Sequence, residues 1–114
     1  MKYLTFMILT TIFYTVYLSA HASQNRSAPV NGSTVSSPES VKIWFDSTLE
    51  NAFHSIQVKD ASGKRVDKND VKVVDSNTLE VGLSELKPGA YTVNWTAVAR
   101  DGHPTKGHFN FNVK

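Results

Sequence analysis

The pattern that decides the fold runs from Tyr91 to Val113 and reads YTVNWTAVARDGHPTKGHFNFNV. Apolar and polar residues alternate between Tyr91 and Ala97, and the same period of two returns between His108 and Val113. This period is typical of strands that turn one face to a core and the other to solvent. The stretch therefore predicts two β-strands joined by the connection 99–107.

Shorter runs of the same kind precede this pair of strands. They cover residues 41–45, 56–58, 71–74 and 78–81. Turn-forming residues separate them, and no segment keeps the period of a helix for long. Several short strands without helices between them predict an all-β antiparallel sandwich or barrel. Tyr91 and Trp95, which follow the turn at Pro88-Gly89, are similar to the tyrosine corner and buried tryptophan of immunoglobulin-like sandwiches.

The inward faces of these strands are expected to form the core. The predicted core residues are Phe45, Phe53, Val58, Leu79, Tyr91, Trp95, Phe109 and Phe111. Alternation alone accounts for the aromatic residues among them, so we interpret these as core and not as a binding surface. The segment from Ser23 to Ser40 is rich in Ser, Asn, Pro and Gly, and it predicts an extended lead-in without regular structure.

We interpret residues 1–20 as a secretory signal peptide and residues 21–114 as the one working domain. Lys2 is followed by a long apolar run from Leu4 to Leu18 and then by small residues, which is the layout of a signal peptide. A transmembrane anchor is the alternative, but a polar stretch follows where basic stop-transfer residues would be expected. The mature chain is therefore expected to be exported and not inserted in a membrane.

Composition excludes several classes of function. The chain has 12 Lys and Arg against 10 Asp and Glu, and removing residues 1–20 takes away one lysine and no acid, which leaves +1. So small a charge points to neither nucleic acid nor an anionic membrane as partner. There is no cysteine, and both methionines, Met1 and Met7, lie in the signal segment, so soft-ligand sites that select Cu(I) are excluded. The glycine-rich phosphate-binding loop and the nucleophile elbow, which mark many enzymes, are missing as well.

The connection 99–107 contains the residues that could carry chemistry. Asp101 and His103 are two apart, so on an extended backbone their side chains leave the same side. Gly102 allows a bend between them, and Pro104 keeps His103 extended. A plain hairpin turn is the alternative for Asp-x-His in isolation. A free amino-terminal His21 would add an amine and an imidazole, which completes a set of three nitrogens and one oxygen suited to tetragonal Cu(II).

Two cleavage sites compete for the start of the mature chain. Cleavage after Ala20 leaves His21 first, whereas Ala20-His21-Ala22 fits the A-x-A rule and would leave Ser23 first.

The remaining histidines, His54 and His108, are expected to matter less for metal binding. His108 should face solvent by alternation, and His54 is a candidate only for a secondary metal contact.

The mature chain resembles the periplasmic copper-resistance proteins CopC and PcoC, and its ending is similar to their YobA-type relatives. The resemblance rests on His21-Ala22, Ser27-Ala28-Pro29, Gly32-Ser33-Thr34-Val35, Leu86-Lys87-Pro88-Gly89-Ala90-Tyr91, Trp95 and Asp101-Gly102-His103-Pro104, with Gly107, Phe109, Phe111 and Val113. It implies an immunoglobulin-like Greek-key β-sandwich in the bacterial periplasm. It also implies one Cu(II) per chain, bound by the amine and imidazole of His21 with Asp101 and His103.

The resemblance further implies a monomeric carrier or buffer in copper homeostasis or resistance, with a membrane copper-transport protein of the CopD type as partner. Two features depart from the family. The methionine-rich Cu(I) loop of some members is missing, and Asp46-Ser47 stands where many relatives have Ser-Glu. Two rival functions are an oxygenase with a copper brace at an amino-terminal histidine, and a metal-free immunoglobulin-like interaction module. A saturated four-ligand site favours the carrier over the enzyme.

Overall fold

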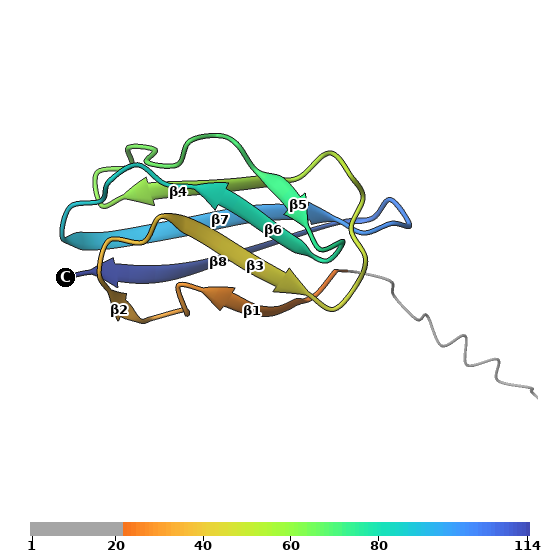
Figure 1. Cartoon of the computed structure of the whole chain (residues 1–114), viewed down its shortest axis with the longest axis horizontal. Coiled ribbons are helices and arrows are strands. Elements are labelled where there is room, and N and C mark those ends of the chain that lie inside the picture. The colour runs from red at the N-terminus through yellow and green to blue at the C-terminus, as the bar shows by residue number, and fades with distance from the viewer. Residues whose placement is uncertain (1–21) are drawn as a thin grey trace, which may run out of the picture.

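The hairpin predicted from the sequence forms the longest pair of strands. The computed structural model describes residues 22–114. In it, β7 (Gly89–Val98) and β8 (Pro104–Val113) pair antiparallel from Gly89↔Val113 to Val98↔Pro104. This hairpin spans the length of the domain and ends in the turn at residues 99–103 (Figure 1).

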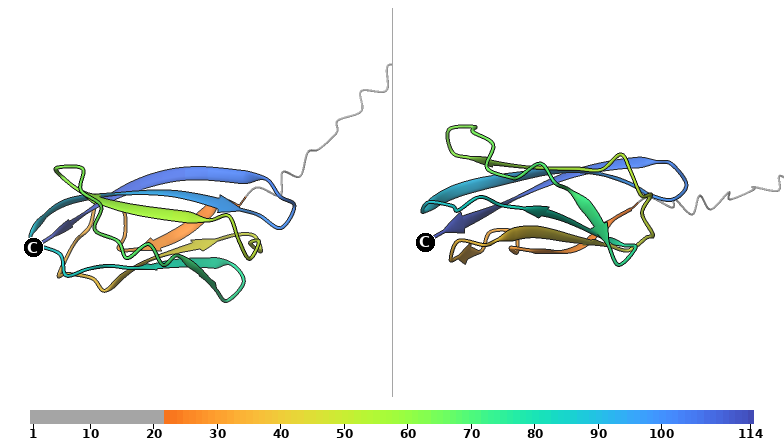
Figure 2. Two further views of the ribbon diagram at one scale, coloured as in Figure 1. Left: turned by 90° about the horizontal axis from the view of Figure 1, so that it is seen from above. Right: turned by 45° about the horizontal axis from the view of Figure 1, so that its top comes forward.

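Two four-stranded sheets face each other across the core (Figure 2). The first has the order β1-β3-β6-β5, with β1 Gln24–Ala28, β3 Ser40–Phe45, β6 Thr78–Gly82 and β5 Lys72–Val74. The second has the order β2-β8-β7-β4, with β2 Thr34–Val35 and β4 Ser55–Asp60. All pairings are antiparallel except that of β2 with β8. The predicted all-β, immunoglobulin-like Greek-key sandwich is confirmed. No helix within residues 22–114 is long and apolar enough to cross a membrane.

The expectation of an irregular lead-in at Ser23 to Ser40 is wrong, because this segment contains β1 and β2. β1 pairs with β3, and β2 pairs with the end of β8. Both strands lie at the edges of their sheets. An edge strand uses only one side of its backbone for pairing, so a Ser- and Asn-rich sequence is tolerated there. Tertiary pairing outweighs the weak strand propensity of these residues.

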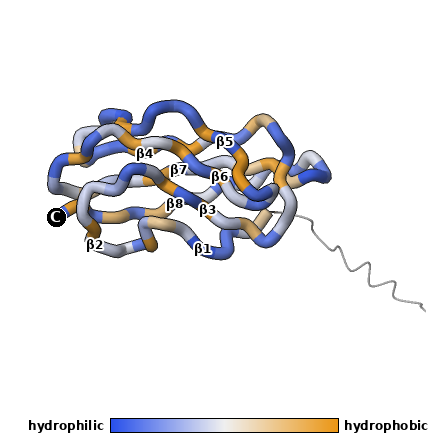
Figure 3. The backbone as a smooth tube through the Cα atoms, viewed as in Figure 1, coloured by the Kyte–Doolittle hydropathy of each residue, from blue (hydrophilic) through white to orange (hydrophobic). Residues whose placement is uncertain are grey.

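The core contains every predicted residue except Phe53. Phe53 is 86% exposed and has φ of 71°, whereas Leu49 in the same loop is buried. Phe53 lies in a loop, where strand alternation does not determine which side faces the core. The tyrosine corner is present, because the Tyr91 hydroxyl donates a hydrogen bond of 2.6 Å to the Lys87 carbonyl. Figure 3 shows the alternation of polar and apolar residues along the strands.

Trp95 fills the core at one end of the sandwich. Its ring meets the ring of Phe45 edge-on, with 5.0 Å between the centroids, and its indole N–H donates to the Gln24 side chain at 3.2 Å. Gly107 lies opposite Trp95 on β8, and a Cβ built there would lie 2.3 Å from the indole ring. Gly107 therefore leaves the space that the tryptophan occupies.

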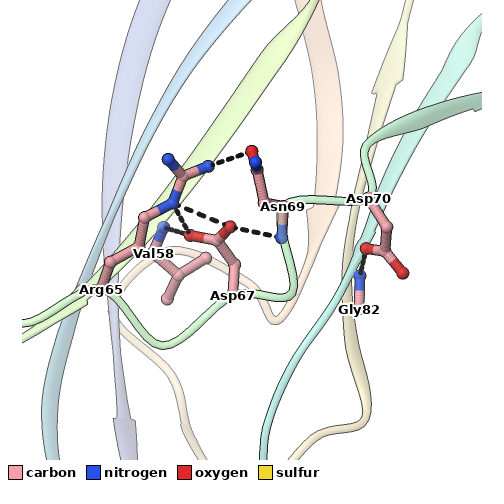
Figure 4. Close-up of polar contacts among 6 residues, drawn as sticks. All are labelled: Val58, Arg65, Asp67, Asn69, Asp70 and Gly82. Atoms are coloured by element: carbon pink, nitrogen blue, oxygen red, sulfur yellow. Dashed lines mark hydrogen bonds and ion pairs between the residues drawn. The ribbon is translucent and has the colours of Figure 1, made fainter.

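The connection between β4 and β5 is fastened to both sheets by two carboxylates (Figure 4). Asp67, whose side chain is fully buried, accepts hydrogen bonds from the Val58 backbone N–H at 2.9 Å and from Arg65 Nε at 2.8 Å. Asp70 accepts from the Gly82 N–H at 2.8 Å. Val58 lies in β4 of one sheet and Gly82 in β6 of the other, so the connection ties the sheets together.

Asp67→Asn is expected to lower the free energy of unfolding by about 2 kcal/mol at neutral pH, because a buried hydrogen-bonding network loses its charge. Burial alone would raise the pKa of Asp67, but the hydrogen bonds from Arg65 and the Val58 N–H outweigh it and hold the pKa below the ordinary 3.8. The carboxylate therefore contributes stability that is present above 3.8 and is lost as the pH falls through the lowered pKa.

Urea denaturation from pH 7 to pH 2 measures this effect. The difference between Asp67→Asn and the wild type should shrink below pH 3.8, and the exposed control Glu85→Gln should match the wild type throughout. A difference that stays constant down to pH 2 would show that the charge of Asp67 does not stabilise the fold.

Candidate metal centre

A tight turn presents the two predicted loop ligands at one end of the sandwich. The Gly102 N–H donates to the Ala99 carbonyl at 2.8 Å, and the Ala99 N–H donates to the His103 carbonyl at 3.2 Å. Gly102 has φ of +88°, in the left-handed region that favours glycine. The chain therefore reverses direction within a few residues and places Asp101 and His103 on either side of the glycine.

The structure brings Asp101 and His103 together. One carboxylate oxygen of Asp101 accepts a hydrogen bond from the His103 backbone N–H at 3.0 Å, and the other lies 3.0 Å from His103 Nδ1. The two side chains are 32% and 66% exposed, respectively. The close pair of Asp101 Oδ2 and His103 Nδ1 is the one through which both side chains could bind a single metal ion, in place of the proton that they share here.

The beginning of the described chain lies beside this turn. Ala22 is buried, and its carbonyl accepts a hydrogen bond of 2.8 Å from the hydroxyl of Thr105, two residues beyond His103. His21, the third predicted ligand, lies outside the described residues, as does the expected signal peptide. Ala22, the first described residue, is thus attached to the strand that follows the turn.

Asp46 holds the same segment from the other sheet. Its carboxylate accepts a hydrogen bond from the Ser23 N–H at 2.8 Å, and its own N–H donates to the Ser23 carbonyl at 3.1 Å. Asp46 directly follows β3. Asp46-Ser47 is the pair that departs from the family pattern, and in this structure Asp46 fastens the amino-terminal segment.

The other two histidines do not join the turn. His54 Nδ1 accepts a hydrogen bond from the Val98 N–H at 3.1 Å, and its Nε2 bonds to the Glu50 carbonyl at 2.5 Å. With both ring nitrogens engaged, His54 links a loop to β7 and is a structural residue. His108 is exposed on β8, opposite Asn94, as predicted. Within residues 22–114, no group of three or more His, Asp or Glu side chains gathers as a metal site, and Asp101 and His103 form a pair of candidate donors.

A family model, known sequences and a solved structure all relate this chain to one family. A family described as the CopC domain matches residues 24–114. Protein YobA of Escherichia coli (strain K12) is 34% identical over 111 residues, covering 94% of this chain and 90% of that protein. Copper transport protein CutJ of Bacillus subtilis (strain 168) is 33% identical, covering 94% of this chain and 20% of that protein. The crystal structure of CopC from Methylosinus trichosporium OB3b has a TM-score of 0.77 and 30% identity, covering 82% of this chain and 94% of that one.

Proposed function

The chain belongs to the CopC domain family, and from this premise we propose that it is an exported, periplasmic protein that binds copper. It holds one Cu(II) ion and acts as a carrier or buffer in copper homeostasis or resistance. The observation that carries this proposal is the meeting of Asp101 and His103 in a partly exposed turn beside the start of the described chain. An imidazole and a carboxylate are donors that suit Cu(II).

His21 is proposed to supply the two remaining donors, its α-amine and its imidazole. Consecutive Cα atoms are about 3.8 Å apart, so the residue before Ala22 is tied by its peptide bond to a position that Thr105 holds beside the turn. The amine and imidazole of one residue close a six-membered ring around a metal ion. Together with Asp101 and His103 they form the set of three nitrogens and one oxygen.

The contacts of Ala22 support cleavage after Ala20. Ala22 is 1% exposed, and its carbonyl has a side-chain partner on β8. Cleavage after Ala22 would remove a residue that the fold buries, whereas cleavage after Ala20 keeps it and leaves His21 first. We therefore propose His21 as the first residue of the mature protein.

A carrier is favoured over an oxygenase by the chemistry of the turn. In an oxygenase of the histidine-brace type, a second imidazole binds the copper and one coordination position stays open to oxygen. Here Asp101 lies beside His103 instead, and a carboxylate ligand would stabilise Cu(II) against reduction. Four protein donors leave no obvious position for a substrate. The chain is proposed to act as a monomer, without enzymatic activity.

The proposed partner is a membrane copper-transport protein of the CopD type. CutJ, which is named as a copper transport protein, contains a region similar to this chain in about a fifth of its length. This joining of a similar domain to a transport protein supports delivery of copper to such a partner.

The mature protein is expected to bind one equivalent of Cu(II) and to bind Cu(I) only weakly, because residues 21–114 contain neither thiolate nor thioether. Titration against a chromophoric chelator for each oxidation state measures both affinities. The Cu(II) complex should show a weak visible band and no intense thiolate transition. Absence of stoichiometric Cu(II) binding, or tight Cu(I) binding, would contradict the proposed function.

A further inference from the structure

We propose that Thr105 is a positioning residue that sets the affinity for Cu(II) by holding the amino-terminal segment at the metal site. This inference rests on the proposed function. Its starting point is the hydrogen bond of 2.8 Å from the Thr105 hydroxyl to the carbonyl of Ala22. This hydrogen bond joins the segment before β1 to β8, the strand that follows the metal turn.

The position of Thr105 on β8 explains why its hydroxyl needs a hydrogen-bond partner. Phe109, Phe111 and Val113 point into the core, and by the period of a strand Thr105 lies on the same face. It pairs with Ala97, which is completely buried. A polar side chain on this apolar face needs a hydrogen-bond partner, and the Ala22 carbonyl provides it.

Ala22 depends on this bond in turn. It lies before β1, outside the pairing of β1 with β3. A buried backbone carbonyl without a partner is costly, and the partner of this one is a side chain from the other sheet. Losing the Thr105 hydroxyl therefore releases the chain at the residue next to His21.

Asp46 limits the damage when Thr105 is changed. Asp46 fastens Ser23 to the first sheet through its carboxylate and its backbone N–H, independently of β8. The fold and β1 should therefore remain when only the Thr105 bond is lost. What changes is the freedom of the residues before Ser23, which must then be ordered when copper binds. That ordering weakens binding because preorganisation is lost.

The test uses a pair of substitutions at one position. Thr105→Val keeps the shape of the side chain but removes the hydroxyl, and it should weaken Cu(II) binding about fivefold, the effect of one hydrogen bond. Thr105→Ser keeps the hydroxyl and should stay within about twofold of the wild type. Thr92→Val, on the exposed face of β7, is the matched control and should leave the affinity unchanged.

Two further readouts separate positioning from a purely structural role. In a protein with one residue added before His21, the amine is already displaced, so Thr105→Val should cause no additional loss of Cu(II) affinity. In metal-free protein, Thr105→Val should lower the backbone order parameter of Ala22, measured by NMR relaxation, and leave those of Ser23 and β7 unchanged.

The outcomes are distinct for the two proposals. If the wild type binds no Cu(II), the proposed function fails, and this inference fails with it. If the wild type binds Cu(II) and Thr105→Val binds it equally well, only the positioning role is overturned. An equal loss of affinity with and without the added residue would also overturn it.

Discussion

His103→Ala is expected to weaken Cu(II) binding by at least about 100-fold, because even partners behind the direct ligands of a metal commonly contribute 10- to 100-fold. The fold should survive, since the side chain is 66% exposed and the turn is held by backbone hydrogen bonds. Asp101→Ala should weaken binding less, because a carboxylate is a weaker donor to Cu(II) than an imidazole. Competition against a chromophoric Cu(II) chelator gives the dissociation constants.

His108→Ala is the matched control for this substitution. His108 is an exposed histidine on the strand that follows the turn, and its removal should leave Cu(II) affinity unchanged. Thermal unfolding of all the variants checks that the sandwich is intact. Wild-type affinity in both His103→Ala and Asp101→Ala would remove the copper site from the turn.

Blocking the amino terminus is expected to have an effect of the same size. Adding one residue before His21, or acetylating its amine, removes the α-amine donor and opens the six-membered chelate ring. Cu(II) affinity should fall by at least about 100-fold, because a direct ligand is expected to contribute at least as much as the 10- to 100-fold of the partners behind it. The fold should be unaffected, because Ala22 and Ser23 keep their contacts with Thr105 and Asp46.

The exported protein itself provides the control for this prediction. Its intact mass should correspond to a chain that begins at His21. A chain that begins at Ser23 lacks both donors of His21, so it should bind Cu(II) weakly. Strong binding by a chain that begins at Ser23, or by the acetylated protein, would contradict the role given to the amino terminus.

The sequence predicts the hairpin and its turn well because both depend on local patterns. The period of two from Tyr91 onward is a property of adjacent residues, and the spacing of Asp101 and His103 places them on one side of the chain. The structure brings the two side chains together, with 3.0 Å between the Asp101 carboxylate and His103 Nδ1, but through a tight turn at Gly102 and not through an extended backbone. Local geometry of this kind is set by neighbours along the chain, so a sequence pattern predicts it.

Long-range contacts explain what the sequence could not predict. β1 and β2 form because β3 and β8 offer them edges, and nothing in their own composition indicates strands. His54 is fixed by Val98, which lies 44 residues away. Phe53 follows no strand period, so its hydrophobicity was a poor guide to its burial.

The contact between Thr105 and Ala22 belongs to the same class, because it joins residues 83 apart. A weak signal for it exists in the sequence. Thr105 and Gly107 continue the inward face that Phe109, Phe111 and Val113 define, so a polar residue is expected on an apolar face there. That anomaly indicates a hydrogen-bond partner but does not identify it.

One Cu(II) ion is proposed to be bound by the amine and imidazole of His21 together with Asp101 and His103. Pulsed electron paramagnetic resonance of the exported protein, loaded with one equivalent of Cu(II), tests it most directly because the remote nitrogens of bound imidazoles modulate the signal. We expect a single copper species with two bound imidazoles in the wild type and with one bound imidazole in His103→Ala. A wild-type spectrum of hydrated copper, or one with the same imidazole count in His103→Ala, would contradict the claim.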